Sequence, residues 1–439
     1  TLQSVSSNDI LSANMDLYPR KIMPLLIDRL QSRKATLLTG SRQTGKTTLV
    51  RDLLPQASKF NIVYHNLDDP DERLRIAENP VVRLDSPDSL VVIDEIQKQP
   101  SLMDVVKLLA DRPGSPRFLL LGSSQILLLK QVRETLAGRV TLLNLWPLSV
   151  GERVNAETTP HILMDRLMED SETAIEHRAA SPPSVDVARA LRESRDFVLR
   201  WGGYPPVETM ESDSARRTWL RDYRNTYLER DLADIGRVAD LDQFARAQSV
   251  LAARTGQILS YSEVARDLGV AANTVHRYVR FLEISYQVYL LRPYSPNITK
   301  RLVKSPKLYW LDTGLARLLS GRSDTADGAL YESFIAGELL KWLSWQEDPP
   351  NLGFYRTQAG AEVDFIIWDE NTLIAMEVKA SQNVHPGSAS NLSALLDQTA
   401  DTDKAKKRLG LVVYRGTEIR QLTQNIWAVP DWLLFGGTT

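Results

Sequence analysis

The sequence has no cysteine, which excludes disulfide bonds, zinc sites built on thiolates and cysteine nucleophiles. It also has no apolar run near the ~20 residues that a membrane-spanning helix needs, so no membrane partner is expected. Residues 1–13 are mostly polar and lack the apolar stretch of a secretory signal, although the sequence does not begin with Met. These absences fit a reducing cytoplasm, which is the location that we expect.

Neither sign of charge dominates the chain. The formal net charge is −2, so a surface for nucleic acid would have to be a local basic patch. Charged residues make up 25% and hydrophobic residues 43% of the sequence, as in ordinary globular proteins. A length of 439 residues is enough for about three domains, each with its own core.

A glycine-bounded loop in the first quarter of the chain has the pattern of a phosphate-binding loop, G-x-x-x-x-G-K-[ST]. An apolar run precedes it and a helix-forming stretch follows it, as this motif requires. Glycine at the first and sixth positions allows the backbone N–H groups to turn toward phosphate without a Cβ in the way. The following helix adds its positive end. The expected ATP-binding residues are Gly40, Ser41, Arg42, Gln43, Thr44, Gly45, Lys46, Thr47 and Thr48.

Two residues of this loop have expected chemical roles. Lys46 should reach the β- and γ-phosphates of ATP, and the Thr47 hydroxyl should ligate Mg²⁺. The alternative, a chance glycine-rich turn before a helix, requires four fixed positions and two flanking elements to coincide.

Residues 89–95 form a short continuous apolar run that ends in two acids, which is typical of a buried parallel strand. The carboxyl ends of such strands face the ligand crevice. We therefore expect Asp94 to hold the Mg²⁺ shell and Glu95 to polarise the attacking water. An isolated acid pair would more often be a solvated turn, but here it follows a phosphate loop.

Two further positions are candidates for the same site. Residues 118–125 predict another buried strand that ends in small polar residues, where Ser123 or Ser124 would sense the γ-phosphate or cap the next helix. Arg139 offers a positive charge to a γ-phosphate. Its alternatives are a site in its own subunit, a site in a neighbouring subunit, or a surface salt bridge.

This spacing of motifs resembles the AAA-type ATPases. It is most similar to a large prokaryotic group in which the ATPase is fused to a winged helix and a C-terminal domain of the restriction-endonuclease type. The resemblance covers most of the chain and implies an αβα core, ring-like homo-oligomers with a hexamer favoured, and a DNA-related role. It rests on the phosphate loop, Ile93-Asp94-Glu95, Gly122-Ser123-Ser124, Ala137-Gly138-Arg139 and Leu145–Ser149.

The remaining chain divides by composition into further units. We predict an α/β multidomain protein with a P-loop ATPase core at 1–150, a helical lid at 151–235, a winged helix at 236–318 and a nuclease-like α/β domain at 319–439. Residues 156–195 are locally acidic and predict a variable insertion in the lid. Residues 201–206, Trp-Gly-Gly-Tyr-Pro-Pro, predict a fixed turn.

The middle unit has a helix-turn-helix pattern, since a helix over 260–268 ends at Gly269 and another begins almost at once. Residues 286–294 and 308–312 would form the wing. Residues 241–310 contain ten Lys and Arg and four Asp and Glu, a basic patch that favours DNA. The alternative is a winged helix used only for assembly or as part of the lid. The expected DNA contacts are Asn273, Thr274, His276, Arg277 and Arg280 on the second helix, and Lys300, Arg301, Lys304 and Lys307 on the wing.

The C-terminal unit carries a second chemical constellation. Asp364 lies on one predicted strand, and Glu377 and Lys379 lie on the next, where alternate residues share a face. This spacing resembles the restriction-endonuclease site. Asp364, Glu377 and Glu332 would hold Mg²⁺ and Lys379 would orient water. Residues 409–415 and 426–435 would close the sheet.

These patterns together predict an ATP-hydrolysing protein that binds and remodels duplex or branched DNA, with ATP and Mg²⁺ as cofactors. The nuclease-like domain would either cut DNA or serve as a relic that only binds. The alternative function is a regulatory or assembly ATPase that acts as a nucleotide switch.

Overall fold

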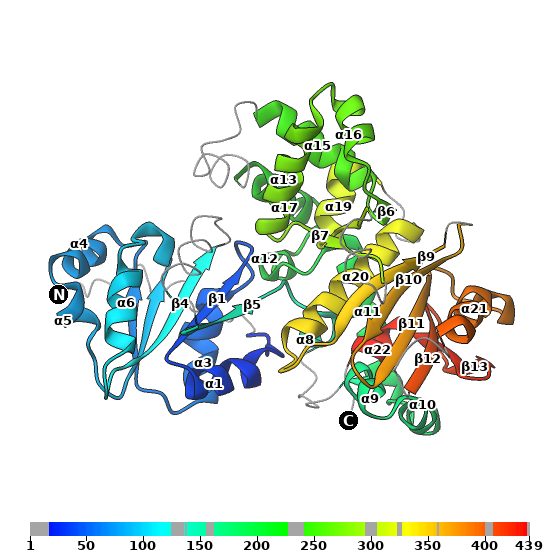
Figure 1. Cartoon of the computed structure of the whole chain (residues 1–439), viewed down its shortest axis with the longest axis horizontal. Coiled ribbons are helices and arrows are strands. Elements are labelled where there is room, and N and C mark those ends of the chain that lie inside the picture. Colours follow the sequence, from blue (N-terminus) through cyan, green and yellow to red (C-terminus); the bar gives the residue numbers. More distant parts are fainter. Residues whose placement is uncertain are drawn as a thin grey trace.

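The N-terminal unit is built on a parallel sheet. The structure is a computed structural model that describes residues 17–123, 136, 138–154, 162–226, 241–294, 305–322, 327–357, 360–399 and 407–436. Five parallel strands lie in the order β2-β3-β4-β1-β5, at the left of Figure 1. They are β1 (Ala35–Gly40), β2 (Ile62–Asn66), β3 (Leu90–Asp94), β4 (Arg117–Ser123) and β5 (Val140–Asn144). The predicted parallel core is confirmed.

Helices cover both faces of this sheet, because successive strand residues point to opposite sides. On one face, Leu37 and Ile93 pack with α4 (Pro70–Glu78), α5 (Pro80–Leu84) and α6 (Leu102–Ala110). On the other, Leu38 and Val92 pack with α1 (Met23–Ser32) and with the helix that leaves the phosphate loop. That helix is continuous through α2 (Lys46–Thr48), a π-helical segment (Leu49–Leu53) and α3 (Leu54–Ala57).

The lid contains α11 (Val185–Trp201), α12 (Pro205–Glu208) and α13 (Asp213–Thr226). The segment expected to be a variable insertion forms α9 (Leu163–Glu169) and α10 (Ser171–Ala180), and both pack on the C-terminal domain. Leu163, Met164 and Leu167 belong to the same buried cluster as the C-terminal strands. Apolar residues at helical spacing inside the acidic stretch explain this packing.

The middle module, at the top of Figure 1, combines helices with a three-stranded antiparallel sheet in the order β6-β8-β7. Gly269 ends α16 in the left-handed conformation, with φ 67°, and α17 begins three residues later at Ala272. The elements are α15 (Leu241–Ala253), β6 (Gln257–Ile258), α16 (Tyr261–Leu268), α17 (Ala272–Ile284), β7 (Val288–Leu291), β8 (Lys307–Trp310) and α19 (Thr313–Ser320).

The C-terminal domain has a six-stranded mixed sheet in the order β13-β14-β12-β11-β10-β9. α20 (Gly328–Ser344) packs on one face and α21 (Ser390–Thr399) on the other. The strand predicted over 426–435 ends at Pro430, and α22 (Asp431–Phe435) follows it. The strands are β9 (Asn351–Arg356), β10 (Glu362–Trp368), β11 (Thr372–Lys379), β12 (Lys407–Tyr414), β13 (Arg420–Thr423) and β14 (Ile426–Pro430).

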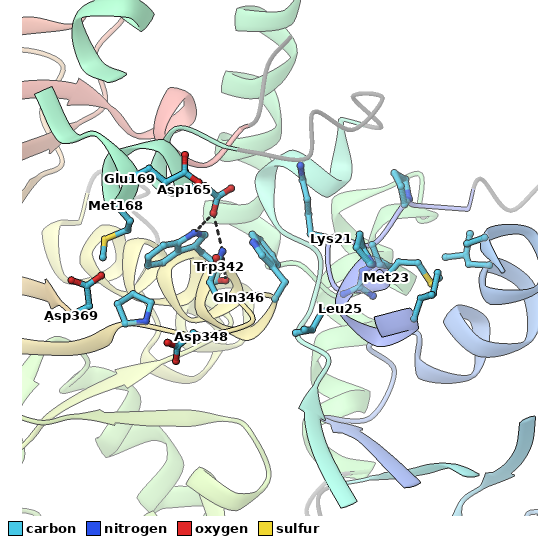
Figure 2. Close-up of a pocket in the computed structure, with 18 of the residues that line it drawn as sticks. Lys21, Met23, Leu25, Asp165, Met168, Glu169, Trp342, Gln346, Asp348 and Asp369 are labelled. Carbon is cyan, nitrogen blue, oxygen red and sulfur yellow. Dashed lines mark hydrogen bonds between the residues drawn. The ribbon is translucent and has the colours of Figure 1, made fainter. Parts of the chain in front are cut away.

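A cavity of about 880 Å³ lies where the ATPase core meets the C-terminal domain. Figure 2 shows Lys21, Met23 and Leu25 on one side of it, and Trp342 of α20 with Gln346, just beyond the end of that helix, on the other. A carboxylate of α9, Asp165, accepts hydrogen bonds from the Trp342 indole (2.7 Å) and the Gln346 amide (2.9 Å). Within the ranges given above, no helix has both the length and the apolar character that crossing a bilayer demands.

A buried ion pair should decide the stability of the C-terminal domain. The Asp431 carboxylate is fully buried and accepts bonds from Arg195 of α11 (3.1 Å) and Tyr331 of α20 (2.8 Å). Asp431→Ala leaves the buried Arg195 guanidinium without its buried partner, so the free energy of unfolding should fall by about 3–5 kcal/mol. Asp196→Ala removes an exposed carboxylate that pairs with Arg195 and Arg415, and it should cost less than about 1 kcal/mol. Urea unfolding followed by tryptophan fluorescence measures both; equal losses would contradict this assignment.

Candidate active site

The phosphate loop has the geometry that its sequence predicts. Gln43 and Gly45 adopt positive φ angles of 61° and 89°, and the helix begins directly at Lys46. The Lys46 ammonium donates hydrogen bonds to the carbonyls of Gly40 (3.0 Å) and Ser41 (2.8 Å). The loop thus holds its lysine against its own backbone, beside the helix N-terminus where phosphate binds.

Glycine at position 40 has a second reason besides the one predicted. A Cβ there would lie 2.2 Å from the Leu145 carbonyl oxygen, because the chain leaving β5 passes directly against the loop. Position 40 also has a φ of 152°. Glycine is therefore required there for close packing of β1 against the end of β5, in addition to any contact with phosphate.

Arg20, which precedes α1, braces the loop from behind. Its guanidinium donates to the Thr44 carbonyl (2.8 Å) and the Trp146 carbonyl (2.5 Å), and it pairs with Glu152 at 3.2 Å. Arg20 is buried, as is Glu152. A buried and paired arginine of this kind fixes the loop in one position relative to the lid.

Asp94 lies beside Thr47 at the carboxyl edge of the sheet. The Thr47 hydroxyl donates to Asp94 Oδ2 at 2.8 Å, and the Tyr64 hydroxyl donates to the same oxygen at 2.5 Å. Burial, followed by the Asp94 carboxylate, raises the pKa of Tyr64 well above its usual range. The tyrosine therefore stays a donor that orients Asp94.

The Thr47 hydroxyl and the Asp94 carboxylate are hard oxygen donors that already lie together, and this donor set fits Mg²⁺. In a complex with ATP these two residues would hold the ion, which supplies neutralising charge to the phosphates. Lys46 would add a second positive charge from the loop.

Glu95 follows Asp94 at the tip of β3 in a left-handed conformation, with φ 56°. Burial, and then the Asp94 carboxylate, raises its pKa above the ordinary value. Its carboxylate accepts a hydrogen bond from the Gln97 side chain. A half-buried acid with a raised pKa beside the phosphate loop suits the predicted role of polarising a water molecule.

An aromatic cluster from the lid covers the loop. The Tyr204 hydroxyl contacts Ser41 Oγ at 3.4 Å, and the Tyr223 hydroxyl contacts Tyr204 at 3.1 Å and the Arg42 carbonyl at 3.5 Å. Trp219 stacks on Tyr223 with ring centroids 5.2 Å apart. A cavity of about 490 Å³ lies between this cluster and the loop, lined by Lys46, Thr47, Glu95, Trp219 and Tyr223 among others.

The two other candidates for the ATP site, Arg139 and Ser123 or Ser124, are not seen to contribute a side chain to it in the part of the chain that the structure describes. Arg139 precedes β5, whose first residue pairs with the first residue of β1, so it lies at the sheet edge opposite the phosphate loop. There it pairs with Asp111 at 2.8 and 3.2 Å. Action on the nucleotide of its own subunit is excluded by this position, and action on a neighbouring subunit stays a prediction. Ser123 ends β4 opposite Gly40, but its side chain and Ser124 lie outside the described residues.

In the C-terminal domain the structure brings Asp364, Glu377 and Lys379 together. Phe365 pairs with Met376, so Asp364 faces Glu377 across the two strands. Asp364 Oδ2 accepts a hydrogen bond from the Val378 backbone at 2.8 Å, and Lys379 donates to Glu377 at 2.7 Å. The register in which β10 pairs with β11 thus places Asp364 beside Glu377.

The three acids predicted to hold Mg²⁺ in this domain do not form a metal-binding group among the described residues. Glu332 is held by Lys307 (2.9 Å) and by the Tyr309 hydroxyl (2.5 Å). Among the described residues, no three acidic, histidine or cysteine side chains are arranged to hold a metal ion. The residues present therefore do not fit a metal held by Glu332, Asp364 and Glu377.

Lys307 is also wrongly placed by the sequence prediction. It was expected on an exposed wing in contact with DNA phosphate, but it is 2% exposed and points into the carboxylates of the C-terminal domain. The other predicted wing contacts, Lys300, Arg301 and Lys304, lie outside the described residues. On α17, Asn273, His276, Arg277 and Arg280 are exposed and Thr274 is half-buried.

Fold and site together define a P-loop ATPase. Three family models match the chain: an AAA domain over residues 32–154, and two domains of unknown function, DUF8612 over residues 192–326 and DUF4143 over residues 327–434. The uncharacterized protein Rv2008c of Mycobacterium tuberculosis is 34% identical over 412 residues, which are 92% of this chain and 81% of that protein. The chain belongs to the family of this mycobacterial protein. The uncharacterized protein MJ1544 of Methanocaldococcus jannaschii is 22% identical, over 78% of this chain and 74% of its own length.

Solved structures show weaker likeness. The Walker-type ATPase PABY2304 of Pyrococcus abyssi has a TM-score of 0.41 and 14% identity, over 69% of this chain and 99% of that one. RuvB T158V of Thermotoga maritima has a TM-score of 0.26 and 17% identity, over 63% of this chain and 88% of its own. Neither likeness carries an argument about function.

The sequence did not show the roles of three side chains that complete these sites, Tyr64, Tyr204 and Lys307. Tyr64 lies on the strand next to Asp94, and the common edge of parallel strands was a usable signal for it. Tyr204 lies in the recognised turn at 201–206, but nothing in the sequence shows what the turn contacts. Lys307 pairs with acids that lie 25 to 57 positions away, so local patterns could not reveal it.

Glu95→Gln should keep nucleotide affinity and lower the ATP turnover rate by at least about 100-fold, because it removes the base and preserves the shape of the side chain. Phosphate release and fluorescent-nucleotide binding measure the two effects. Glu78→Gln, at an exposed acid of α4, is the matched control and should leave both unchanged. Full turnover in Glu95→Gln would show that another group handles the water.

The paired acids of the C-terminal domain should make stability depend on pH. Burial, and then Glu332 for Asp364 and Asp364 for Glu377, raises each pKa to about 7 from ordinary values of 3.8 and 4.5. Both acids bind protons more tightly in the folded chain, so this contribution to stability falls as pH rises from about 4 to 7. Glu377→Gln should reduce that fall in thermal unfolding measured across this range. An identical pH profile in both proteins would contradict the assignment.

Proposed function

We propose that the chain is an ATP-driven DNA-processing protein in which the ATP cycle at the phosphate loop moves the helix pair α16–α17. The observation that supports this most strongly is a set of direct contacts between the ATP site and the middle module. Tyr286, two residues beyond α17, donates from its hydroxyl to Asn144 of β5 at 2.9 Å. The same hydroxyl lies 3.4 Å from Thr39, the residue before Gly40.

Further contacts reinforce this connection. The Tyr286 ring meets Trp146 edge-on, with centroids 5.2 Å apart and an interplanar angle of 88°. Asp312, which caps α19 through the Leu315 N–H (2.9 Å), also accepts from the Gly203 N–H of the lid at 2.9 Å. The middle module therefore contacts both the core strands and the lid turn that covers the nucleotide.

The exposed side of α17 has the chemistry of a nucleic-acid surface. Arg277 and Arg280 line a hollow of about 470 Å³ together with Arg292 and Glu283. His276 stacks on Tyr261 of α16 with centroids 3.5 Å apart. Planar guanidinium groups suit phosphate oxygens, and the exposed start of a helix-turn-helix recognition helix suits base edges. Duplex or branched DNA is the partner in this proposal, and the middle module binds it as a winged helix does.

The proposal includes a homo-oligomer, with a ring-like hexamer favoured. Arg139 lies at the sheet edge opposite the phosphate loop with its side chain 39% exposed, so a neighbouring subunit is the place where it would meet a γ-phosphate. Such an arginine raises the hydrolysis rate by several powers of ten. Release of its Asp111 partner would accompany that contact.

The nuclease-like C-terminal domain takes the binding role, not the cutting role, in this proposal. Lys307 occupies the carboxylates that would otherwise help to hold a metal ion. This also favours the second candidate function, a nucleotide switch in which hydrolysis resets a complex. The two differ in whether DNA changes the ATPase rate.

The test compares ATPase rates without DNA and with duplex, single-stranded and four-way-junction DNA. The proposal expects DNA to stimulate hydrolysis and to bind with an affinity that falls with salt. Arg277→Ala/Arg280→Ala should weaken DNA binding about tenfold or more and lose the DNA-dependent part of the rate. Arg246→Ala, at an exposed arginine of α15, is the control and should keep both. Absence of stimulation together with absence of binding at low salt would leave the nucleotide switch.

A further inference from the structure

Three acidic side chains and a buried lysine meet where the middle module touches the C-terminal domain. The Lys307 ammonium lies 2.9 Å from Glu332 and 3.6 Å from Asp364, and it also pairs with Glu362. Lys307 is 2% exposed. Glu332 belongs to α20, whereas Glu362 and Asp364 belong to β10, so one ammonium holds carboxylates from two elements of the C-terminal domain.

The lysine reaches this position from the middle module. It is the first residue of β8, and its backbone pairs with Leu291 of β7 and Ile258 of β6. β7 is itself continued toward the C-terminal sheet, because the Tyr294 N–H donates to the Phe354 carbonyl of β9 at 2.6 Å and Arg292 accepts from Phe354 at 3.1 Å. The ammonium is therefore fixed by two sheets at once.

Carboxylates that converge in a buried place need a cation, since an unpaired buried charge costs several kcal/mol. A divalent metal or an ammonium can supply it. Here the Lys307 ammonium pairs with both Glu332 and Glu362, and these two carboxylates compensate the cost of burying its charge. A metal ion coordinated by Glu332 and Asp364 would have to occupy the place where the Lys307 ammonium lies.

One oxygen of the cluster shows where a metal ion would still find a ligand. Glu377 Oε2 is buried and has no hydrogen-bond partner among the described residues, and Glu377 is 7% exposed. Its other oxygen accepts from Lys379. Without the Lys307 ammonium, its former carboxylate partners are unpaired. Together with this Glu377 oxygen they form an oxygen-rich site of the kind that Mg²⁺ and Mn²⁺ prefer.

We propose that Lys307 is the resident cation of this carboxylate site: its ammonium fills the place of a divalent metal ion and fastens the middle module to the C-terminal domain. The site is then a buried ion-pair cluster that connects the middle module to the C-terminal domain. Lys307 acts as a positioning residue that holds Glu332, Glu362 and Asp364 around one ammonium. The proposal does not depend on DNA binding or on the ATP cycle.

The test uses the full chain without nucleotide and compares Lys307→Met with the wild type in EDTA and in Mn²⁺. Lys307→Met should melt well below the wild type in EDTA, because the acids lose their cation, and Mn²⁺ should restore most of that loss. Calorimetric titration should find one Mn²⁺ more per chain in Lys307→Met than in the wild type, bound at least tenfold more tightly than any Mn²⁺ at this site in the wild type. Any Mn²⁺ bound at Thr47 and Asp94 is common to both proteins and cancels.

Lys379→Met is the matched control. It removes the same charge from the neighbouring strand but leaves Lys307 in place, so it should gain no Mn²⁺ site. Should Lys307→Met not fold in EDTA, circular dichroism on refolding with and without Mn²⁺ gives the same readout. Lys307→Met/Glu332→Gln, which removes one acid with the lysine, should need Mn²⁺ less.

Three results would overturn the proposal. Lys307→Met that loses equal stability with and without Mn²⁺, and binds no additional ion, would make Lys307 an ordinary structural ion pair. Wild-type protein that binds Mn²⁺ in a manner abolished by Asp364→Asn would show that the lysine does not exclude metal. Lys379→Met that gains the same Mn²⁺ site would show that any loss of positive charge suffices.

Discussion

Six residues, Lys307 to Asp312, connect the three parts of the molecule. At one end the Lys307 ammonium is buried among carboxylates of the C-terminal domain, and at the other the Asp312 carboxylate binds the lid turn and caps α19. β8 begins at Lys307 and ends two residues before Asp312, so it holds both side chains at a fixed spacing. The lid turn in its turn places Tyr204 against Ser41 of the phosphate loop. Electrostatic contacts of buried groups, which are costly to break one at a time, thus join the ATP site to both other modules.

The lid turn can serve as this junction only because of its glycines. Gly202 has a φ of 82°, and a Cβ there would lie 2.2 Å from the Asp312 carboxylate oxygens. A Cβ on Gly314, at the start of α19, would likewise lie 2.2 Å from the Trp201 carbonyl oxygen. The two segments therefore approach each other as closely as backbone allows, and a shift of the lid on nucleotide binding would move α19 with it. The Tyr286 contact to Asn144 gives α17 a second connection to the core.

The sequence predicted what is encoded locally and missed what is encoded by tertiary contact. The phosphate loop and the Asp94 strand follow from short patterns, since glycine spacing and apolar runs each specify local geometry, and strand alternation places Glu377 and Lys379 on one face. Lys307 was assigned to DNA because it lies in a basic stretch, but its burial depends on acids of another domain. Gly40 was explained by phosphate, yet Leu145 of a strand end about a hundred residues away requires it. Arg139 was weighed for the active site, and only the parallel pairing of β5 with β1 shows that it lies at the other edge.

The central claim is that nucleotide binding at the phosphate loop changes the stability of the lid turn and of β8. Amide hydrogen exchange with and without a non-hydrolysable ATP analogue and Mg²⁺ tests it. The account predicts slower exchange at residues 40–48 and also at residues 202–204 and 307–315, with every change absent in Lys46→Ala. Slower exchange confined to residues 40–48 and 94–95 in the wild type would contradict it, because nucleotide binding would then not affect the lid turn or β8.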